Sequence, residues 1–261
     1  MNETKTALPR IMTGLLLAAA VIHGPIAQLP HYHQFADQAP RFGIPHFADV
    51  LSNFGFLVVA LWGWFALQPL REHPALADGW PGYRLFLIGL LLTAFGSAWY
   101  HLAPDDDRLV WDRIPIALAC GGLLAGVWGD AHRRSSGEVA AALAVFAVAS
   151  VAWWRFTGIV GEGDLRPYLA LQVLPFLLVP IWQTAYDARK SDRWFFGAAL
   201  LIYAIAKWAE TNDHEIGAVL GVTGHTLKHL LATLSSALIV AGLRCRMRGV
   251  EPATASAVAL Q

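Results

Sequence analysis

The stretch Arg84–Leu102, RLFLIGLLLTAFGSAWYHL, decides the fold class of this chain. After its leading arginine it runs through apolar, small or weakly polar side chains as far as His101. A helix needs roughly 20 mostly apolar residues to cross a bilayer, and this stretch has that length. Similar stretches recur along the chain, and together they predict eight spans. The eight cover Ile11–Leu29, Val50–Leu67, Arg84–Leu102, Trp111–Asp130, Val139–Trp154, Pro167–Tyr186, Trp194–Trp208 and Gly224–Leu243.

The composition supports a membrane protein. Apolar residues make up 56% of the 261 residues, charged residues only 15%, and the mean hydropathy is +0.46. Soluble domains carry roughly 25% charged residues, and one soluble core of this length could not bury so many apolar side chains. These values exclude a water-soluble enzyme and a disordered chain. The net charge of zero gives no reason to expect a nucleic-acid partner, and Cys120 and Cys245 are too few for a disulfide framework.

We therefore predict an all-α, polytopic membrane helix bundle with a seven-helix core and one additional N-terminal helix. Residues 1–47 would form the N-terminal helix and an outer loop, 48–249 the core, and 250–261 a short tail. The first span has two interpretations, because the basic residues before it and the run Ala18–Ala20 also fit a cleavable secretory signal. The apolar run continues to Ile26, which favours a retained helix.

Lysine and arginine residues predict the orientation, because cytoplasmic loops carry the excess of positive charge. Segments on the side of the N-terminus hold Lys5, Arg10, Arg71, Arg84, Arg133, Arg134, Arg189, Lys190, Arg193, Arg244, Arg246 and Arg248. Segments on the other side hold only Arg41, Arg108, Arg113, Arg155 and Arg166. We expect both termini in the cytoplasm of a bacterial cell, with the protein in the plasma membrane.

Histidines at the ends of two spans form a candidate metal site. His225 and His229 are four residues apart, so both imidazoles project from one helix face. His101 ends another span on the same predicted outer side, Ser97 lies one turn before it, and Asp112 begins the next span. Three histidines with one open position is the arrangement of a catalytic zinc site. On spacing alone, the alternative is that these polar residues face lipid headgroups or pack within the bundle.

The same residues resemble a known family. The run Gly96-Ser97-x-x-Tyr100-His101, followed by Asp112-Arg113-Ile114-Pro115, is similar to the second and third core-helix motif of the alkaline ceramidases. The pair His225-x-x-x-His229 resembles their last-helix motif, and Ser52-Asn53-x-x-Phe56 resembles their first. The resemblance covers Asp49 to about Leu243. Alkaline ceramidases belong to a superfamily of seven-helix membrane hydrolases that also includes the adiponectin-receptor-like proteins.

The resemblance implies a role for each of these residues. His101, His225 and His229 would hold Zn²⁺, Asp112 would act as general base and then acid, and Ser97 would bind the water or the developing oxyanion. The chemistry agrees, because zinc brings the pKa of a bound water to about 7. A hydroxyl donor can stabilise an oxyanion, and a carboxylate can pass a proton to the leaving amine.

Two features depart from the family pattern. Ceramidases carry an acidic calcium-binding loop before the first core helix, whereas here only Asp37 and Asp49 are acidic in that region, so we do not expect calcium. An acidic residue often follows the family's catalytic aspartate, whereas Arg113 follows Asp112 here. The presence of Arg113 at this position indicates that the contacts with the lipid headgroup differ from those of the ceramidases, more than the zinc site does.

The leading functional prediction is a zinc-dependent intramembrane hydrolase. It would cleave the amide bond of a ceramide-like N-acyl lipid, taken from the bilayer, to a free fatty acid and a long-chain amine. The alternative is a non-enzymatic, receptor-like lipid-binding protein with a structural zinc. A third interpretation is a haem protein, which would need His101 opposite His229, because an i,i+4 pair cannot supply both axial ligands.

Other polar groups on the same side have simpler interpretations. We expect Asp105–Asp107 to form a solvated turn, and the loop with His31, His33 and His46 to be solvated rather than a lid. Lys207 and Glu210 can pair at i,i+3, and Lys228 can meet Glu210 while pointing away from the two histidines beside it.

Overall fold

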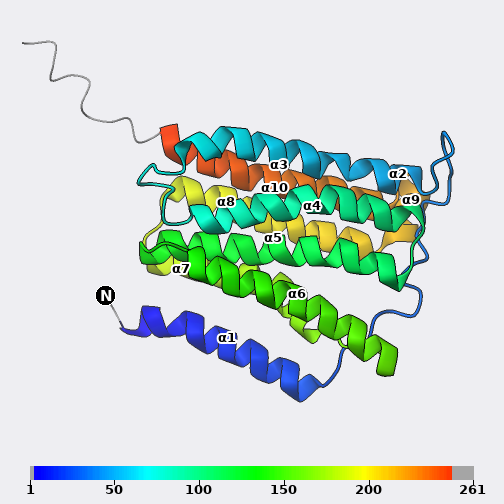
Figure 1. Cartoon of the computed structure of the whole chain (residues 1–261), viewed down its shortest axis with the longest axis horizontal. Helices are drawn as coiled ribbons and strands as arrows, with labels where there is room; N and C mark the ends of the chain where they lie inside the picture. The colour runs from blue at the N-terminus through cyan, green and yellow to red at the C-terminus, as the bar shows by residue number, and fades with distance from the viewer. Residues whose placement is uncertain (1–2, 249–261) are drawn as a thin grey trace, which may run out of the picture.

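A computed structural model describes residues 3–248, and within them it is a bundle of long helices without strands (Figure 1). The predicted all-α membrane bundle is confirmed, while the predicted tail 250–261 lies outside the described residues. The helices are α1 (Glu3–His23), α2 (Phe47–Ser52), α3 (Phe54–Leu67), α4 (Trp80–Leu102), α5 (Asp106–His132), α6 (Gly137–Val160), α7 (Arg166–Ala185), α8 (Lys190–Thr211), α9 (Asp213–Leu220) and α10 (Gly224–Arg248), with a 3₁₀ turn at Gln68–Leu70.

Six of the described helical segments are long and apolar enough to cross a membrane. They are Phe47–Leu70, Trp80–Leu102, Asp106–His132, Gly137–Val160, Arg166–Ala185 and Gly224–Met247. This confirms a multi-pass membrane protein. Two predicted spans do not meet that description: α1 offers only the shorter apolar segment Ala7–His23, and α8 carries charged residues near both ends.

The first helix ends earlier than predicted. We expected it to reach Leu29, but α1 ends at His23 and the chain turns at Gly24, whose φ is +81°. Pro25 follows, and a residue before proline is disfavoured in the helical region. The helix packs against α7 and lies along one side of the bundle (Figure 1).

A seam of small residues brings α4 against α5. Glycines recur at seven-residue spacing on α4, and a Cβ on any of them would overlap α5. The seam pairs Gly82 with Gly126, Gly89 with Ala119, and Gly96 with Trp111. Small residues of this kind let helix backbones approach closely in a membrane. The last pair brings Ser97 close to Asp112, because Gly96 precedes Ser97 on α4 and Trp111 precedes Asp112 on α5.

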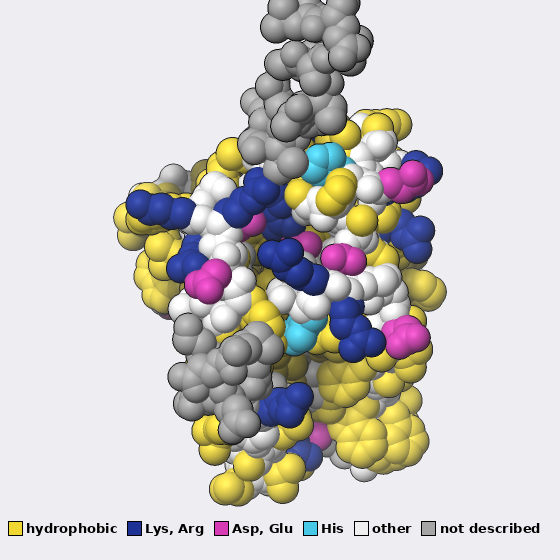
Figure 2. Space-filling model, turned by 90° about the vertical axis from the view of Figure 1, so that its left-hand side faces the viewer, with side chains coloured by type: hydrophobic (Ala, Val, Ile, Leu, Met, Phe, Trp, Pro, Cys, Tyr) yellow, Lys and Arg dark blue, Asp and Glu magenta, His cyan; other side chains and the backbone are white. Residues whose placement is uncertain are grey.

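The two ends of the bundle differ in charge. Figure 2 views the end where α1 begins and α10 ends, and lysine and arginine side chains gather on it. The connections at this end include Arg71, Arg133, Arg134 and Arg189. At the opposite end, α10 begins at Gly224, where a Cβ would overlap the carbonyl oxygen of Ala209 on α8. This contact holds the start of α10 beside the end of α8.

Candidate metal centre

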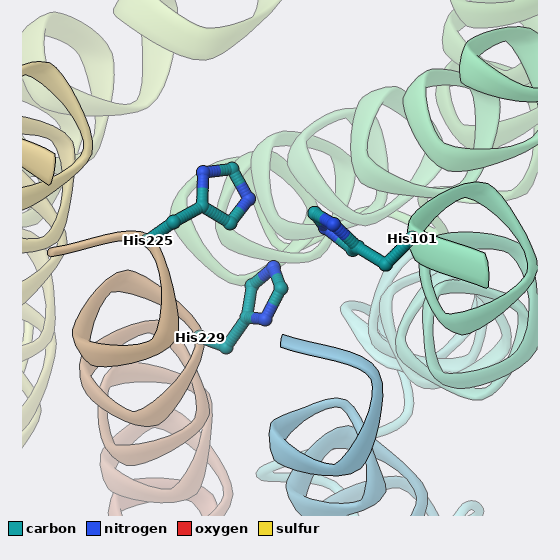
Figure 3. Close-up of side chains that lie close together, drawn as sticks. All are labelled: His101, His225 and His229. Atoms are coloured by element: carbon teal, nitrogen blue, oxygen red, sulfur yellow. The ribbon is translucent and has the colours of Figure 1, made fainter. Parts of the chain in front are cut away.

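His101, His225 and His229 come together at the end of the bundle opposite the basic one. Figure 3 shows their rings converging, two from successive turns of α10 and one from the last turn of α4. One ring nitrogen from each lies within 4.8 Å of the others, and the ring centroids are 4.8 to 5.1 Å apart. All three side chains are buried. The sequence-predicted convergence of these residues is present in the structure.

Local sequence explains how the histidines reach one point. His225 and His229 share a face of α10 because residues four apart are neighbours on a helix. The backbone N–H of His225 donates to Asp213 Oδ1 at 2.7 Å, which satisfies a free donor of the first turn. On the other side, α4 ends at Leu102 just before Pro104, so His101 occupies its last turn.

The chemistry of these side chains fits a metal ion. His229 Nε2 and both ring nitrogens of His101 are buried and have no hydrogen-bond partner among the described residues. Buried polar atoms are nearly always paired, so an unpaired nitrogen on each of His101 and His229, close to His225, indicates a missing ligand. In a tetrahedral zinc site the nitrogens would be about 3.3 Å apart, so the distances between them would shorten by up to roughly 1.5 Å.

Ser52 on α2 orients one of the three rings. Its hydroxyl donates to the carbonyl oxygen of Asp49 at 3.0 Å and lies 2.8 Å from His229 Nδ1. Since the hydroxyl hydrogen is engaged, its oxygen accepts from Nδ1–H, and this leaves Nε2 free toward the other histidines. Metal-binding histidines commonly have such a partner, which fixes the tautomer and the ring orientation.

Asp49 is a site residue that sequence reasoning did not identify. Its side chain is fully buried, Oδ1 accepts from Thr226 at 2.5 Å, and Oδ2 lies 4.0 Å from His101 Nδ1. The sequence placed Asp49 only in a loop considered for calcium. The nearby Asp37 instead binds the start of α2, where its Oδ2 accepts from the N–H groups of Ala48 and Asp49.

The loop between α1 and α2 is solvated in part, as predicted, since His31 and residues 38–43 are exposed, but its centre covers the histidines, which we did not expect. Phe35 is 4% exposed, and its ring centroid lies 4.7 Å from that of His101 and 4.4 Å from that of His225. His33 bonds Tyr100 Oη at 2.9 Å. His46 is also partly buried, and only His31 of the three loop histidines is exposed. A single phenylalanine in a polar loop gave no periodic signal, so only the tertiary fold reveals its place.

Ser97, Asp112 and His229 line one cavity of about 1220 Å³, its open mouth included. Along α5 the wall extends from Asp112 to Leu123, which is roughly 16 Å at 1.5 Å per residue. Asp112 is buried, and its Oδ1 has no partner among the described residues. The deeper wall is mainly apolar and includes Phe86, Leu90, Leu123, Leu200 and Ile239. The cavity therefore joins the polar groups beside the histidines to an apolar channel.

Lys228 departs from its predicted position. As expected, its ammonium donates to Glu210 Oε1, at 2.9 Å, and Glu210 also pairs with Lys207. However, the same ammonium lies 2.9 Å from His225 Nε2, whereas we expected it to point away from the histidines. Residues three apart on a helix are neighbours, and the long side chain bends toward His225.

The remaining acidic clusters serve the helix ends. The predicted turn at Asp105–Asp107 includes the start of α5, where Asp105 Oδ1 accepts from the N–H of Arg108 at 2.7 Å. The region from Glu210 to Thr223, expected to be a loop, contains the short helix α9. Among the described residues neither segment adds a ligand atom to the group of three histidines, although Asp213 of the second bonds the backbone of His225.

Comparison of the sequence with protein-family models gives no match, and comparison with curated proteins gives none either.

Proposed function

We propose that this protein is a zinc-dependent intramembrane hydrolase of the alkaline ceramidase type, which cleaves the amide bond of an N-acyl lipid. The observation that carries the proposal is a group of three buried histidines, two of them with unpartnered ring nitrogens, beside a cavity that also holds Ser97 and Asp112. Within the described residues the group offers three protein ligands, which leaves a coordination position for water or substrate. The apolar depth of the cavity suits an acyl chain.

His101, His225 and His229 would hold the zinc, which when bound supplies a Lewis acid and an acidified water at neutral pH. Asp112 Oδ1, which has no partner within the described chain, would accept a proton and return it to the leaving amine nitrogen. Ser97 Oγ would donate to the carbonyl oxygen as negative charge develops on it. Phe35 and its loop would exclude bulk water from the histidines.

We place the histidine end of the bundle on the outer side of a bacterial plasma membrane. The basic residues at the opposite end support this orientation, because cytoplasmic loops carry the positive excess (Figure 2). An amphiphilic substrate would then enter sideways from the outer leaflet with its amide at headgroup level.

Metal content is the first experiment. We expect about one zinc per chain in protein purified in detergent without chelators, and its loss in a His225→Ala/His229→Ala variant of wild-type helicity. No bound metal in the intact protein would contradict both the hydrolase proposal and the family resemblance. Fatty acid released from a lipid amide then separates the hydrolase from the alternative of a receptor with a structural zinc.

Asp112→Asn tests the proton transfer. The variant keeps the size of the side chain and lies outside the histidine group, so it should retain zinc while losing 100-fold or more of its turnover, since general acid–base groups contribute about 10²–10⁴-fold. Metal analysis and fatty-acid release from the same preparation are the measurements. Full turnover in the variant would remove Asp112 from the mechanism.

A further inference from the structure

The cavity contains a buried arginine that forms no ion pair with a carboxylate of residues 3–248. Arg113 is 2% exposed and lines the cavity beside Asp112. Its Nε and Nη1 have no hydrogen-bond partner in the described part of the chain, and no acidic oxygen there lies within 4.0 Å of its guanidinium. A buried charge is normally paired or bound to a ligand, because removing it from water is costly.

The other buried arginine in this bundle shows the usual arrangement. Arg246, at the basic end, is 6% exposed and pairs with Asp130 at 2.6 Å and with Asp192 at 3.1 Å. The bundle therefore provides carboxylates for a buried guanidinium at one end. At the other end it leaves the guanidinium of Arg113 with aromatic neighbours.

These neighbours hold the Arg113 side chain while leaving hydrogen-bond donors free. Its Cζ lies 4.0 Å from the ring centroid of Trp154, 5.0 Å from that of Tyr32 and 5.4 Å from that of Tyr168. Aromatic rings attract a guanidinium through its charge, but they do not satisfy its in-plane N–H groups. Those N–H groups form a planar fork that suits a carboxylate or phosphate.

The charge of the cavity also favours an anion. Its wall holds Arg113, Lys207 and Lys228 against only two carboxylates, those of Asp112 and Glu210. Glu210 is shared by both lysines, so it cannot neutralise Arg113 as well. A divalent metal on neutral imidazoles would add further positive charge.

We propose that Arg113 binds an anionic group on the substrate, which is thus an N-acyl amino acid or another lipid amide with an acid on its amine portion, rather than a neutral ceramide. This assignment rests on the proposed amide hydrolysis, since it names the substrate class of the same cavity. Tyr32 comes from the loop at the histidine end, so Arg113 lies at the level of the polar groups, above the apolar depth. The acyl chain would occupy that depth.

Binding without turnover tests the anion site directly. Octadecyloxyacetate and 2-octadecyloxyethanol have the same tail and no amide, and they differ in a carboxylate against a hydroxymethyl group. In detergent at pH 8, the protein should bind the carboxylate roughly 10- to 100-fold more tightly. Arg113→Gln should reduce this preference to about 3-fold or less. Arg108→Gln is the matched control, because Arg108 also stacks on a tryptophan of the same end but does not line the cavity.

Turnover of N-oleoylglycine and N-oleoylethanolamine provides the second arm. Wild type and Arg108→Gln should favour the glycine amide in kcat/KM, and Arg113→Gln should lose that preference. Arg113→Lys keeps the charge but not the planar fork, so it should retain part of the preference for the glycine amide. This variant replaces Arg113→Gln as the test if the glutamine variant does not fold.

The outcomes separate the two proposals. Equal binding and equal cleavage of neutral and anionic lipids by wild type would overturn the anion site and leave amide hydrolysis standing. Arg113-dependent binding of the carboxylate lipid without cleavage of any amide would keep the anion site and overturn the hydrolase. Full competition by free acetate at the concentration of the lipid would show a site for small anions and overturn a role in lipid recognition.

Discussion

Replacing Ser52 with alanine should weaken zinc binding without unfolding the protein. In a metal-bound state His229 Nε2 must be unprotonated, so Nδ1 must carry the hydrogen, and its side-chain partner is the Ser52 hydroxyl at 2.8 Å, with the backbone of Asp49 also in reach of the ring. Alanine removes the hydroxyl and leaves the buried N–H poorly satisfied, at a cost of about 1–3 kcal/mol. Without metal the imidazole can adopt the other tautomer, so the cost falls mainly on the metal-bound state.

The expected loss is 10- to 100-fold in zinc affinity, the range seen when such outer partners of ligating histidines are removed. It corresponds to about 1.4–2.7 kcal/mol, in agreement with the cost of the orphaned N–H. Competition against a zinc-chelating dye in detergent measures it. Ser150→Ala is the control, because Ser150 is also buried and bonds a backbone carbonyl, that of Ala147, but has no hydrogen bond to a histidine among the described residues. Wild-type zinc affinity in a folded Ser52→Ala protein would refute this account.

Two further predictions concern stability. Gly96→Ala would force a methyl group into the carbonyl oxygen of Trp111, so it should reduce the stability by about 1–3 kcal/mol and lower the melting temperature. Gly14→Ala is the control, because open space surrounds Gly14. Equal melting temperatures of the two variants would contradict the close packing of α4 on α5. The second concerns Asp164, which lies between α6 and α7. Burial raises the pKa of the Asp164 carboxyl, but hydrogen bonds from Arg166 and neighbouring groups outweigh this effect and hold the pKa below its ordinary value. Its contribution to stability is therefore present above about pH 4 and lost as the pH falls further, so Asp164→Asn should melt lower than wild type at pH 7 and the difference should shrink in acid; a difference independent of pH would exclude that ion pair as its source.

The long helices and the histidine group were predictable because each depends on a short-range pattern. Roughly 20 apolar residues predict a span wherever they occur, and a four-residue spacing places His225 and His229 on one face. The position of His101 was predictable from the topology, because the end of its span and the start of the span with His225 and His229 lie on the same predicted side of the membrane. The end of α1 at His23 was misplaced because apolar composition outweighed the Gly24–Pro25 break in our prediction.

The polar groups around the histidines were not predictable in the same way. Phe35, Asp49 and the cage around Arg113 depend on which loop and which neighbouring helix fold over the site, and no spacing within one element encodes that. Lys228 is different, because its contact with His225 was predictable. The two residues are three apart and are neighbours on the helix, but our prediction considered only the pairing of Lys228 with Glu210.

The unsatisfied groups at the histidine end divide by the ligand they need. His101 and His229 present lone pairs, which call for a cation, whereas Arg113 presents N–H donors, which call for an anion. One ion cannot satisfy both kinds, and an ordered water could satisfy either but would leave the charge of the guanidinium uncompensated. Under the two proposals, a lipid amide with an acidic head and a metal ion would together satisfy both kinds in one cavity. The acid would meet the guanidinium of Arg113, and the histidines would hold the metal, with the amide close to Asp112.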